Sequence, residues 1–228
     1  MEQLATPDFW VAVAQIIIID LLLAGDNAVV IALACRNLPP ELQKKGVFWG
    51  VVGAIALRVG LTAFAATLLT LPWLKIVGAI ALLWIGVKLL TPHEDGGHEI
   101  EGKHDLWGAV RTVIVADFVM SLDNVIGVAG AAKGNLTLLV FGLVVSIPLV
   151  VIGSKLILGL ISRYPTVVTF GGALLGWIAG ELIASDPAAA GLMKTLPTWA
   201  SYAFAAAGAA FVVVVAKLLT MRQRRPAG

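Results

Sequence analysis

One acidic motif occurs twice in the sequence, each time inside a long apolar stretch. Each copy is an acid, five further residues and an Asp-Asn pair: Asp20, Asp26 and Asn27 in the first copy, and Asp117, Asp123 and Asn124 in the second. The offset is 97 residues for both acids (117 − 20 and 123 − 26). A carboxylate in hydrocarbon costs about 2.5–3.5 kcal/mol on insertion scales, so intramembrane acids are functional by default. The duplication makes a chance arrangement of polar residues the less favoured interpretation.

These six side chains offer carboxylate and amide oxygens, which suit a hard divalent cation such as Mn²⁺, Mg²⁺ or Ca²⁺ better than Zn²⁺ or Cu⁺. We therefore predict that all six form a metal site. Met120 is a candidate soft ligand that would favour Mn²⁺, although Met in such a place is more often packing. On an unbroken helix Asp20 and Asp26 would lie about 9 Å and about 120° apart. We expect a helix break at Gly25 to bring the acids of the first copy together. Ser121 could have the same effect in the second copy, although its sequence signal is weaker.

Two basic residues are candidates for balancing the acids. Arg58 and Lys155 are also 97 residues apart (155 − 58). Four carboxylates and two cations leave a net charge of −2, which one divalent cation or two protons would neutralise, as expected for a cation/proton exchanger. The alternatives are a static ion pair or, for Lys155, a side chain that reaches the headgroups. Glu181 is either a pathway residue or an interfacial one.

The composition is that of a polytopic membrane protein. Hydrophobic residues make up 59% and charged residues 13% of the 228 residues, and the mean hydropathy is +0.95. A soluble domain of this size could not bury that much apolar surface. The single cysteine, Cys35, excludes an internal disulfide and a cysteine-rich metal site. We expect an all-α fold with seven membrane spans, over about residues 9–35, 46–70, 73–91, 107–132, 136–162, 166–185 and 199–221.

The repeated features predict an inverted repeat. Spans one to three correspond to spans four to six, and because three is odd, the second unit enters the membrane from the opposite side. The predicted parts are residues 1–91, a loop over 92–106, residues 107–185, and the seventh span with a basic tail over 186–228. We expect the protein to lie in the plasma membrane, and the excess of Lys and Arg on alternate loops predicts an N-terminus outside and a C-terminus in the cytoplasm. The small residues from Ala203 to Ala210 predict close helix packing and a candidate homo-oligomer contact.

The loop over 92–106 contains the three histidines and five acids. It is a candidate ion-loading segment, but its two adjacent glycines and irregular spacing favour a solvated linker. No motif indicates an enzyme, a required cofactor or a nucleic-acid partner. The expected partners are the bilayer and a divalent metal ion.

The two Asp-Asn motifs resemble those of the TerC family of integral membrane proteins, as does the pattern of seven spans with an acidic loop between the halves. The resemblance extends over essentially the whole chain. It implies membership of the broader LysE-type exporter superfamily, the same six metal-handling residues, and Mn²⁺ export. Asp20 and Asp117 stand where some relatives are expected to have Glu.

We thus predict a secondary transporter that exports a divalent metal cation, with Mn²⁺ preferred, in exchange for protons. The alternative is a non-transporting accessory that supplies metal to exported proteins or assists the secretion machinery. An exporter of small organic cations would need an aromatic cage, and the motifs contain only Phe118. A retinal receptor would not explain the repeated acids.

Overall fold

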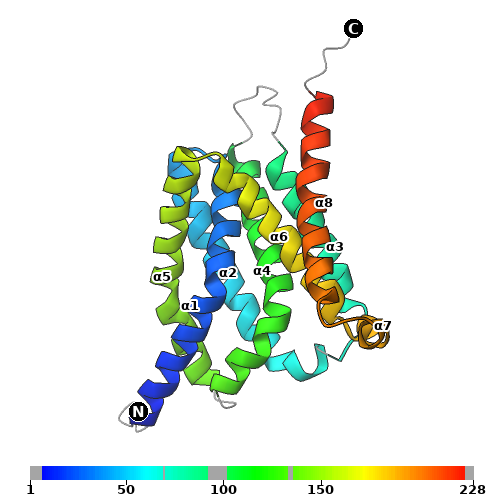
Figure 1. Cartoon of the computed structure of the whole chain (residues 1–228). Helices are drawn as coiled ribbons and strands as arrows, with labels where there is room; N and C mark the ends of the chain where they lie inside the picture. Colours follow the sequence, from blue (N-terminus) through cyan, green and yellow to red (C-terminus); the bar gives the residue numbers. More distant parts are fainter. Residues whose placement is uncertain (1–6, 69, 92–101, 133–135, 224–228) are drawn as a thin grey trace. The chain divides into compact units, whose positions relative to one another are not determined.

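The computed structural model describes residues 7–68, 70–91, 102–132 and 136–223. Within these ranges, side chains are described except at residues 7–9, 12, 18–25, 63, 65–67, 102–105, 123–132 and 136. The described residues form helices without strands (Figure 1). The long helices are α1 (Pro7–Cys35), α2 (Pro40–Leu68), α3 (Leu74–Leu90), α4 (Gly102–Ala132), α5 (Leu136–Arg163), α6 (Thr166–Ser185) and α8 (Ala200–Gln223). The short elements η2 (Pro187–Ala189) and α7 (Ala190–Thr195) connect α6 to α8.

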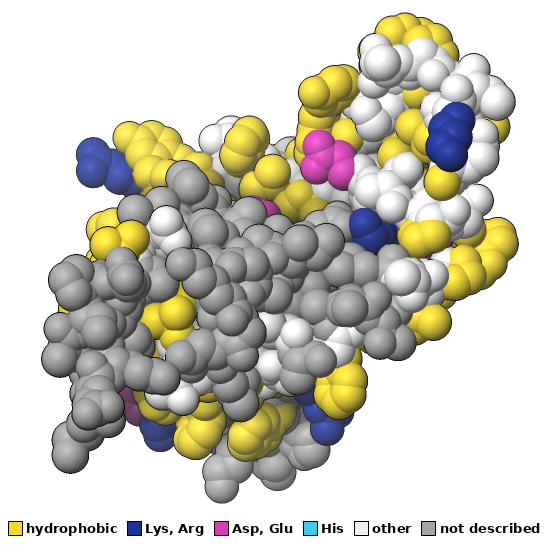
Figure 2. All heavy atoms as spheres, turned by 90° about the horizontal axis from the view of Figure 1, so that it is seen from below, with side chains coloured by type: hydrophobic (Ala, Val, Ile, Leu, Met, Phe, Trp, Pro, Cys, Tyr) yellow, Lys and Arg dark blue, Asp and Glu magenta, His cyan; other side chains and the backbone are white. Residues whose placement is uncertain are grey.

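Several of these helices can cross a membrane. Four segments within the described residues are long and apolar enough to do so: Pro40–Thr62, Thr137–Arg163, Thr166–Ser185 and Ala200–Gln223. The other predicted spans are helical as α1, α3 and α4, but the count of seven spans and their inverted repeat stay predictions. Large apolar side chains are exposed on the helices, among them Phe64, Leu156 and Phe170. Figure 2 shows hydrophobic side chains over much of the described surface, with charged side chains in isolated places. Such a surface suits a lipid environment.

The expected break at Gly25 is wrong, because α1 continues as one α-helix from Pro7 to Cys35. The same holds for α4, which continues through Ser121 to Ala132. A glycine inside a helix costs about 1 kcal/mol relative to alanine. Freeing backbone N–H and C=O groups in hydrocarbon costs several kcal/mol per group. The continuous helix is therefore the cheaper solution.

The helices separate into two compact units that differ from the sequence repeats. The first unit comprises residues 1–69 and 105–158, and the second comprises residues 70–104 and 159–228. The first unit thus contains α1 and α2 with most of α4 and α5, whereas the second contains α3, α6, η2, α7 and α8. Each unit combines helices from both halves of the sequence. The predicted division into residues 1–91 and 107–185 describes the order of the repeats, and it stays a prediction.

The first unit has a core formed by all four of its helices. One cluster joins α1 to α5 through Ile16 and Leu143, which are fully buried. A second cluster joins the ends of α1 and α2 to α4 and α5 through Cys35, Val47, Val113 and Val150. Glycines on the helix faces permit the close approach: a Cβ at Gly50 would lie 3.0 Å from Val113 Cγ1. The core fixes the mutual positions of α1, α2 and α4, which supply the polar residues of the candidate site.

The second unit is held together by small residues on α6 and α8. A Cβ added at Gly176 would lie 2.7 Å from the carbonyl carbon of Gly208 and 2.8 Å from Cα of Ala209. A Cβ at Gly180 would collide with the backbone of Phe204 and Ala205. Helices in lipid associate through such small-residue faces because apolar side chains alone gain little by leaving lipid. The small residues of α8 therefore pack against α6, while an oligomer contact through α8 stays a prediction.

A candidate cation site among α1, α2 and α4

The centre of the first unit contains a buried ion pair between α2 and α4. The Arg58 Nη2 atom lies 2.7 Å from Oδ1 of Asp117, and each of these residues is only 5% exposed. Ser121, one helical turn after Asp117, forms hydrogen bonds with both residues of the pair. Its Oγ accepts a hydrogen bond from Arg58 Nε at 3.2 Å and donates one to Asp117 Oδ2 at 3.2 Å. Both oxygens of the Asp117 carboxylate are therefore engaged.

Sequence spacing explains why these groups meet. Asp117 and Ser121 are four residues apart on α4, so their side chains share one face. Arg58 lies in the interior of α2, 18 residues after Pro40 and 10 before Leu68, where its side chain cannot easily reach water at either end of a membrane span. It therefore needs an acid inside the helix bundle, and the structure provides one of the repeated acids. A guanidinium suits this position because it stays charged when buried and donates through several N–H groups.

Asn27 places an amide oxygen that could bind a cation close to Asp117. It is 5% exposed, and its Oδ1 atom is buried with no hydrogen-bond partner among the described residues. Asn27 and Asp117 line one cavity of about 10 Å³, with Val30, Ile31 and Val113 as its apolar wall. This volume is about what one water-sized particle requires. A buried amide oxygen without a partner is costly and marks a place where a water or cation is expected.

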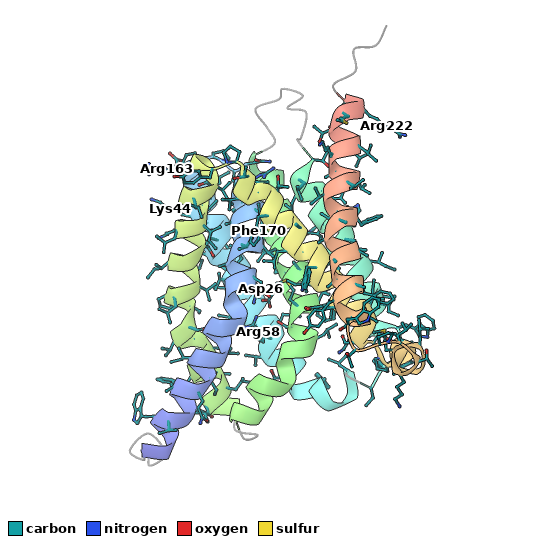
Figure 3. The ribbon with its side chains drawn as sticks, viewed as in Figure 1. Asp26, Lys44, Arg58, Arg163, Phe170 and Arg222 are labelled. Atoms are coloured by element: carbon teal, nitrogen blue, oxygen red, sulfur yellow. The ribbon has the colours of Figure 1, made fainter. Side chains whose placement is uncertain are left out.

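Asp26 lies beside this cluster on α1. It is half-buried and accepts a hydrogen bond from the backbone N–H of Asn27 at 2.8 Å. It lies within electrostatic range of Arg58 and Asp117, and Figure 3 shows Asp26 and Arg58 away from the ends of their helices. Acids from both copies of the motif, Asp26 from the first and Asp117 from the second, thus lie around one arginine.

Three of the six predicted metal residues cannot be placed at the side-chain level. The helices α1 and α4 contain Asp20, Asp123 and Asn124, but the side chains of these residues lie outside the described ones. Among the described side chains, no three His, Cys, Asp or Glu residues gather at one point. The described part of the site is therefore two carboxylates, an amide oxygen and a countercharge. Its donors are oxygens, which fit a hard divalent cation.

The remaining candidates have different surroundings. Met120 is buried on α4 at 4% exposure. Lys155 has an exposed side chain on α5, so the charge balance among the described residues rests on Arg58. Glu181 belongs to α6 of the second unit, is exposed, and accepts a hydrogen bond from Trp177 Nε1 at 2.9 Å. The roles predicted for these three residues stay predictions.

Sequence reasoning missed Asp186, the buried acid at the end of α6. Its Oδ1 accepts from the N–H of Trp73 at 2.9 Å and of Ala188 at 2.7 Å. Its Oδ2 accepts from Lys75 at 3.0 Å and Ile76 at 3.2 Å. Burial by itself raises the pKa of this carboxyl, but the four backbone donors together hold its pKa below the ordinary value.

Asp186 explains an unusual backbone conformation before α3. Trp73 has φ 71°, a left-handed conformation that costs about 1–3 kcal/mol for a residue other than glycine unless its surroundings impose it. The bond from its N–H to Asp186 and the two bonds in the first turn of α3 supply that constraint. The available sequence signal was the Asp-Pro pair directly after an apolar helix, which is typical of a capped turn. Nothing in that pattern identified α3 as the helix being capped.

Residues 5–225 of the chain match a known protein family. The model of the integral membrane protein TerC family matches residues 5–225, so the chain belongs to the TerC family of integral membrane proteins. The resemblance predicted from the two motifs is thereby confirmed.

The sequence is similar to those of membrane proteins from Bacillus subtilis and Escherichia coli. The chain is 44% identical over 179 residues to the uncharacterized membrane protein YjbE of Bacillus subtilis (strain 168), covering 78% of this chain and 82% of YjbE. It is 26% identical over 194 residues to the uncharacterized membrane protein YceF of the same organism, covering 81% of this chain and 75% of YceF. It is also 25% identical over 242 residues to the UPF0053 inner membrane protein YoaE of Escherichia coli (strain K12), covering 97% of this chain and 45% of YoaE. No solved structure matches the chain.

Proposed function

We propose that this protein is a secondary transporter that exports a divalent metal cation, with Mn²⁺ as the expected substrate, in exchange for protons. The observation that carries the proposal is that Asn27 and Asp117 line the same small cavity. The Asn27 oxygen lacks a partner among the described residues, and Asp26 lies within electrostatic range of Asp117. These groups come from both copies of the repeated motif and lie inside apolar helices, where acids serve substrate and ion pathways.

The donor set supports a hard cation. Carboxylate and amide oxygens are the ligands that Mn²⁺, Mg²⁺ and Ca²⁺ share, and the cavity has room for one small particle. The preference for Mn²⁺ within this group rests on the family resemblance and on the thioether of Met120, three residues after Asp117 in α4. It is therefore the part of the proposal that a competition experiment addresses most directly.

Exchange with protons is supported by the cost of leaving buried carboxylates charged. A divalent cation that leaves buried carboxylates would leave their negative charge in a low-dielectric environment, which is costly. Two protons carry the same charge and can replace the cation on these acids. Arg58 is paired with Asp117 and keeps its charge throughout, so it cannot supply the exchanged protons.

The test is transport by the purified full-length chain in sealed proteoliposomes that contain a Mn²⁺-sensitive dye. We expect Mn²⁺ flux that a pH gradient accelerates, with stronger competition from Mg²⁺ and Ca²⁺ than from organic cations. Flux that is independent of the pH gradient would refute proton exchange alone. Binding of Mn²⁺ without flux would favour the alternative, an accessory that supplies metal to exported proteins or assists secretion. Absence of both binding and flux would refute the proposal.

A further inference from the structure

We propose that Arg58 is a tethered cation that competes with the transported cation for Asp117. In this scheme, which rests on the proposed function, the ion pair between Arg58 and Asp117 and the bound cation exclude each other. Binding of the transported cation requires the guanidinium to release the Asp117 carboxylate, and release of the cation allows Arg58 to return. Arg58 is then a residue that determines affinity and release, in addition to balancing charge.

The first argument is the occupancy of the Asp117 oxygens. Oδ1 is 2.7 Å from Arg58 Nη2, and Oδ2 accepts the Ser121 hydroxyl at 3.2 Å. A carboxylate offers about four lone-pair sites, so the engaged oxygens still have lone pairs. However, a divalent cation on the same carboxylate would lie next to the guanidinium without water between them. Two cations in such a position repel each other strongly because the surroundings screen little.

The second argument is the position of the Asn27 amide oxygen. The Asn27 Oδ1 atom is buried and has no partner among the described residues, and Asn27 and Asp117 line the same cavity. A cation held by the Asn27 oxygen in that cavity is therefore next to the carboxylate that Arg58 occupies. The cavity of about 10 Å³ has room for one small cation beside the Asp117 carboxylate.

The third argument is that Arg58 has another carboxylate within range. Asp26 interacts electrostatically with both Arg58 and Asp117. An arginine that leaves Asp117 thus does not have to remain as an isolated charge, which would be costly at 5% exposure. Ser121 guides the exchange, since its hydroxyl accepts from Arg58 Nε and donates to Asp117, so it holds both partners of the pair in register.

The expected effects concern affinity. Arg58→Lys keeps the charge but cannot make the bidentate arrangement with Asp117 and Ser121, so it should compete less well. We expect Mn²⁺ to bind about tenfold more tightly to this variant, with slower export because release becomes harder. Ser121→Ala keeps both charges and loosens the pair, and we expect affinity to rise several-fold. Arg163→Gln removes a charge from an exposed residue in the last turn of α5 and is the matched control with unchanged affinity.

The experiment uses the purified full-length protein labelled with ¹³C,¹⁵N-guanidino arginine. Infrared difference spectra with and without Mn²⁺ report whether an arginine changes its hydrogen bonds, and calorimetry on the same samples gives the affinity. We expect a Mn²⁺-induced guanidinium band in the wild type and in Arg163→Gln, and its loss in Arg58→Lys. Arg58→Lys could fail to fold, and Ser121→Ala then provides the assignment. It removes the acceptor of Arg58 Nε, so a shift of the guanidinium band in this variant assigns the band to Arg58.

The outcomes separate this inference from the proposed function. A wild type that binds and exports Mn²⁺ without any guanidinium band would overturn the inference alone, because Arg58 would then be a static countercharge. Weaker Mn²⁺ binding by folded Arg58→Lys and Ser121→Ala would overturn it as well. A wild type that neither binds nor transports a divalent cation would overturn both proposals.

Discussion

Replacing Asp186 with alanine tests whether one carboxylate holds the beginning of α3. The substitution removes an acceptor shared by four backbone N–H groups, at 2.7–3.2 Å. Two of the donors, Lys75 and Ile76, lie in the first turn of α3, where loss of a capping acceptor costs about 1 kcal/mol. The other two donors belong to Trp73 and Ala188, and hydrogen bonds to a charged group contribute about 1.5–3 kcal/mol each.

These contributions are not additive, and we expect a total loss of about 3–5 kcal/mol. For a chain of this size, the loss corresponds to a decrease in Tm on the order of 10 °C. Asp186→Asn keeps one acceptor oxygen but turns an amide N–H₂ toward two of the donors, so it should be nearly as destabilising. The assay is thermal unfolding of the detergent-solubilised chain followed by tryptophan fluorescence. Glu41→Ala is the control, since it removes an exposed acid from the first turn of α2 and should cost less than about 1 kcal/mol.

The pH dependence has a defined sign. The folded-state pKa of Asp186 lies below its ordinary value of 3.8, so the folded protein favours the ionised form. The stability that Asp186 contributes is fully present above pH 3.8, and it is lost as the pH falls from there through the folded-state pKa. The difference in Tm between the wild type and Asp186→Ala should therefore be constant near neutral pH and shrink below pH 3.8. Equal Tm values for the two proteins at neutral pH would refute the capping role, as would an equally large effect of Glu41→Ala.

Two further predictions concern the candidate site and the α6–α8 contact. Asp26→Asn should abolish Mn²⁺ flux while Tm changes by only a few degrees, because Asp26 is half-buried and the amide keeps its size; wild-type flux would place the site elsewhere. Gly176→Ala should destabilise the protein by about 1–3 kcal/mol, since its Cβ would collide with the carbonyl group of Gly208, whose carbon would be 2.7 Å away. Gly159→Ala, whose Cβ meets nothing within 4 Å, is the control for unfolding by denaturant, and equal midpoints for the two variants would contradict the close packing.

Much of the fold could be predicted from local pattern. Hydrophobic runs and prolines located the long helices, with matching ends at α6, which spans Thr166–Ser185, and a start six residues too late at α2, which begins at Pro40. The duplicated motif indicated the family, and the burial of Arg58 required an acid inside the bundle. The helix break at Gly25 could not be judged in this way. Whether a glycine breaks a helix depends on whether its neighbours can satisfy the freed backbone groups, and sequence does not show those neighbours.

The sequence by itself determined that the chain is helical, lies in a membrane, belongs to a particular family and carries duplicated acids. These properties depend on composition and on spacing along the chain, which sequence records directly. Only the tertiary structure decided that Arg58 pairs with Asp117, 59 residues away, and that Asp186 caps a helix whose first turn is 110 residues earlier. It also decided that the compact units combine helices from both halves of the sequence. Such choices depend on which helix faces can approach closely, and that is set by packing between distant segments rather than by local periodicity.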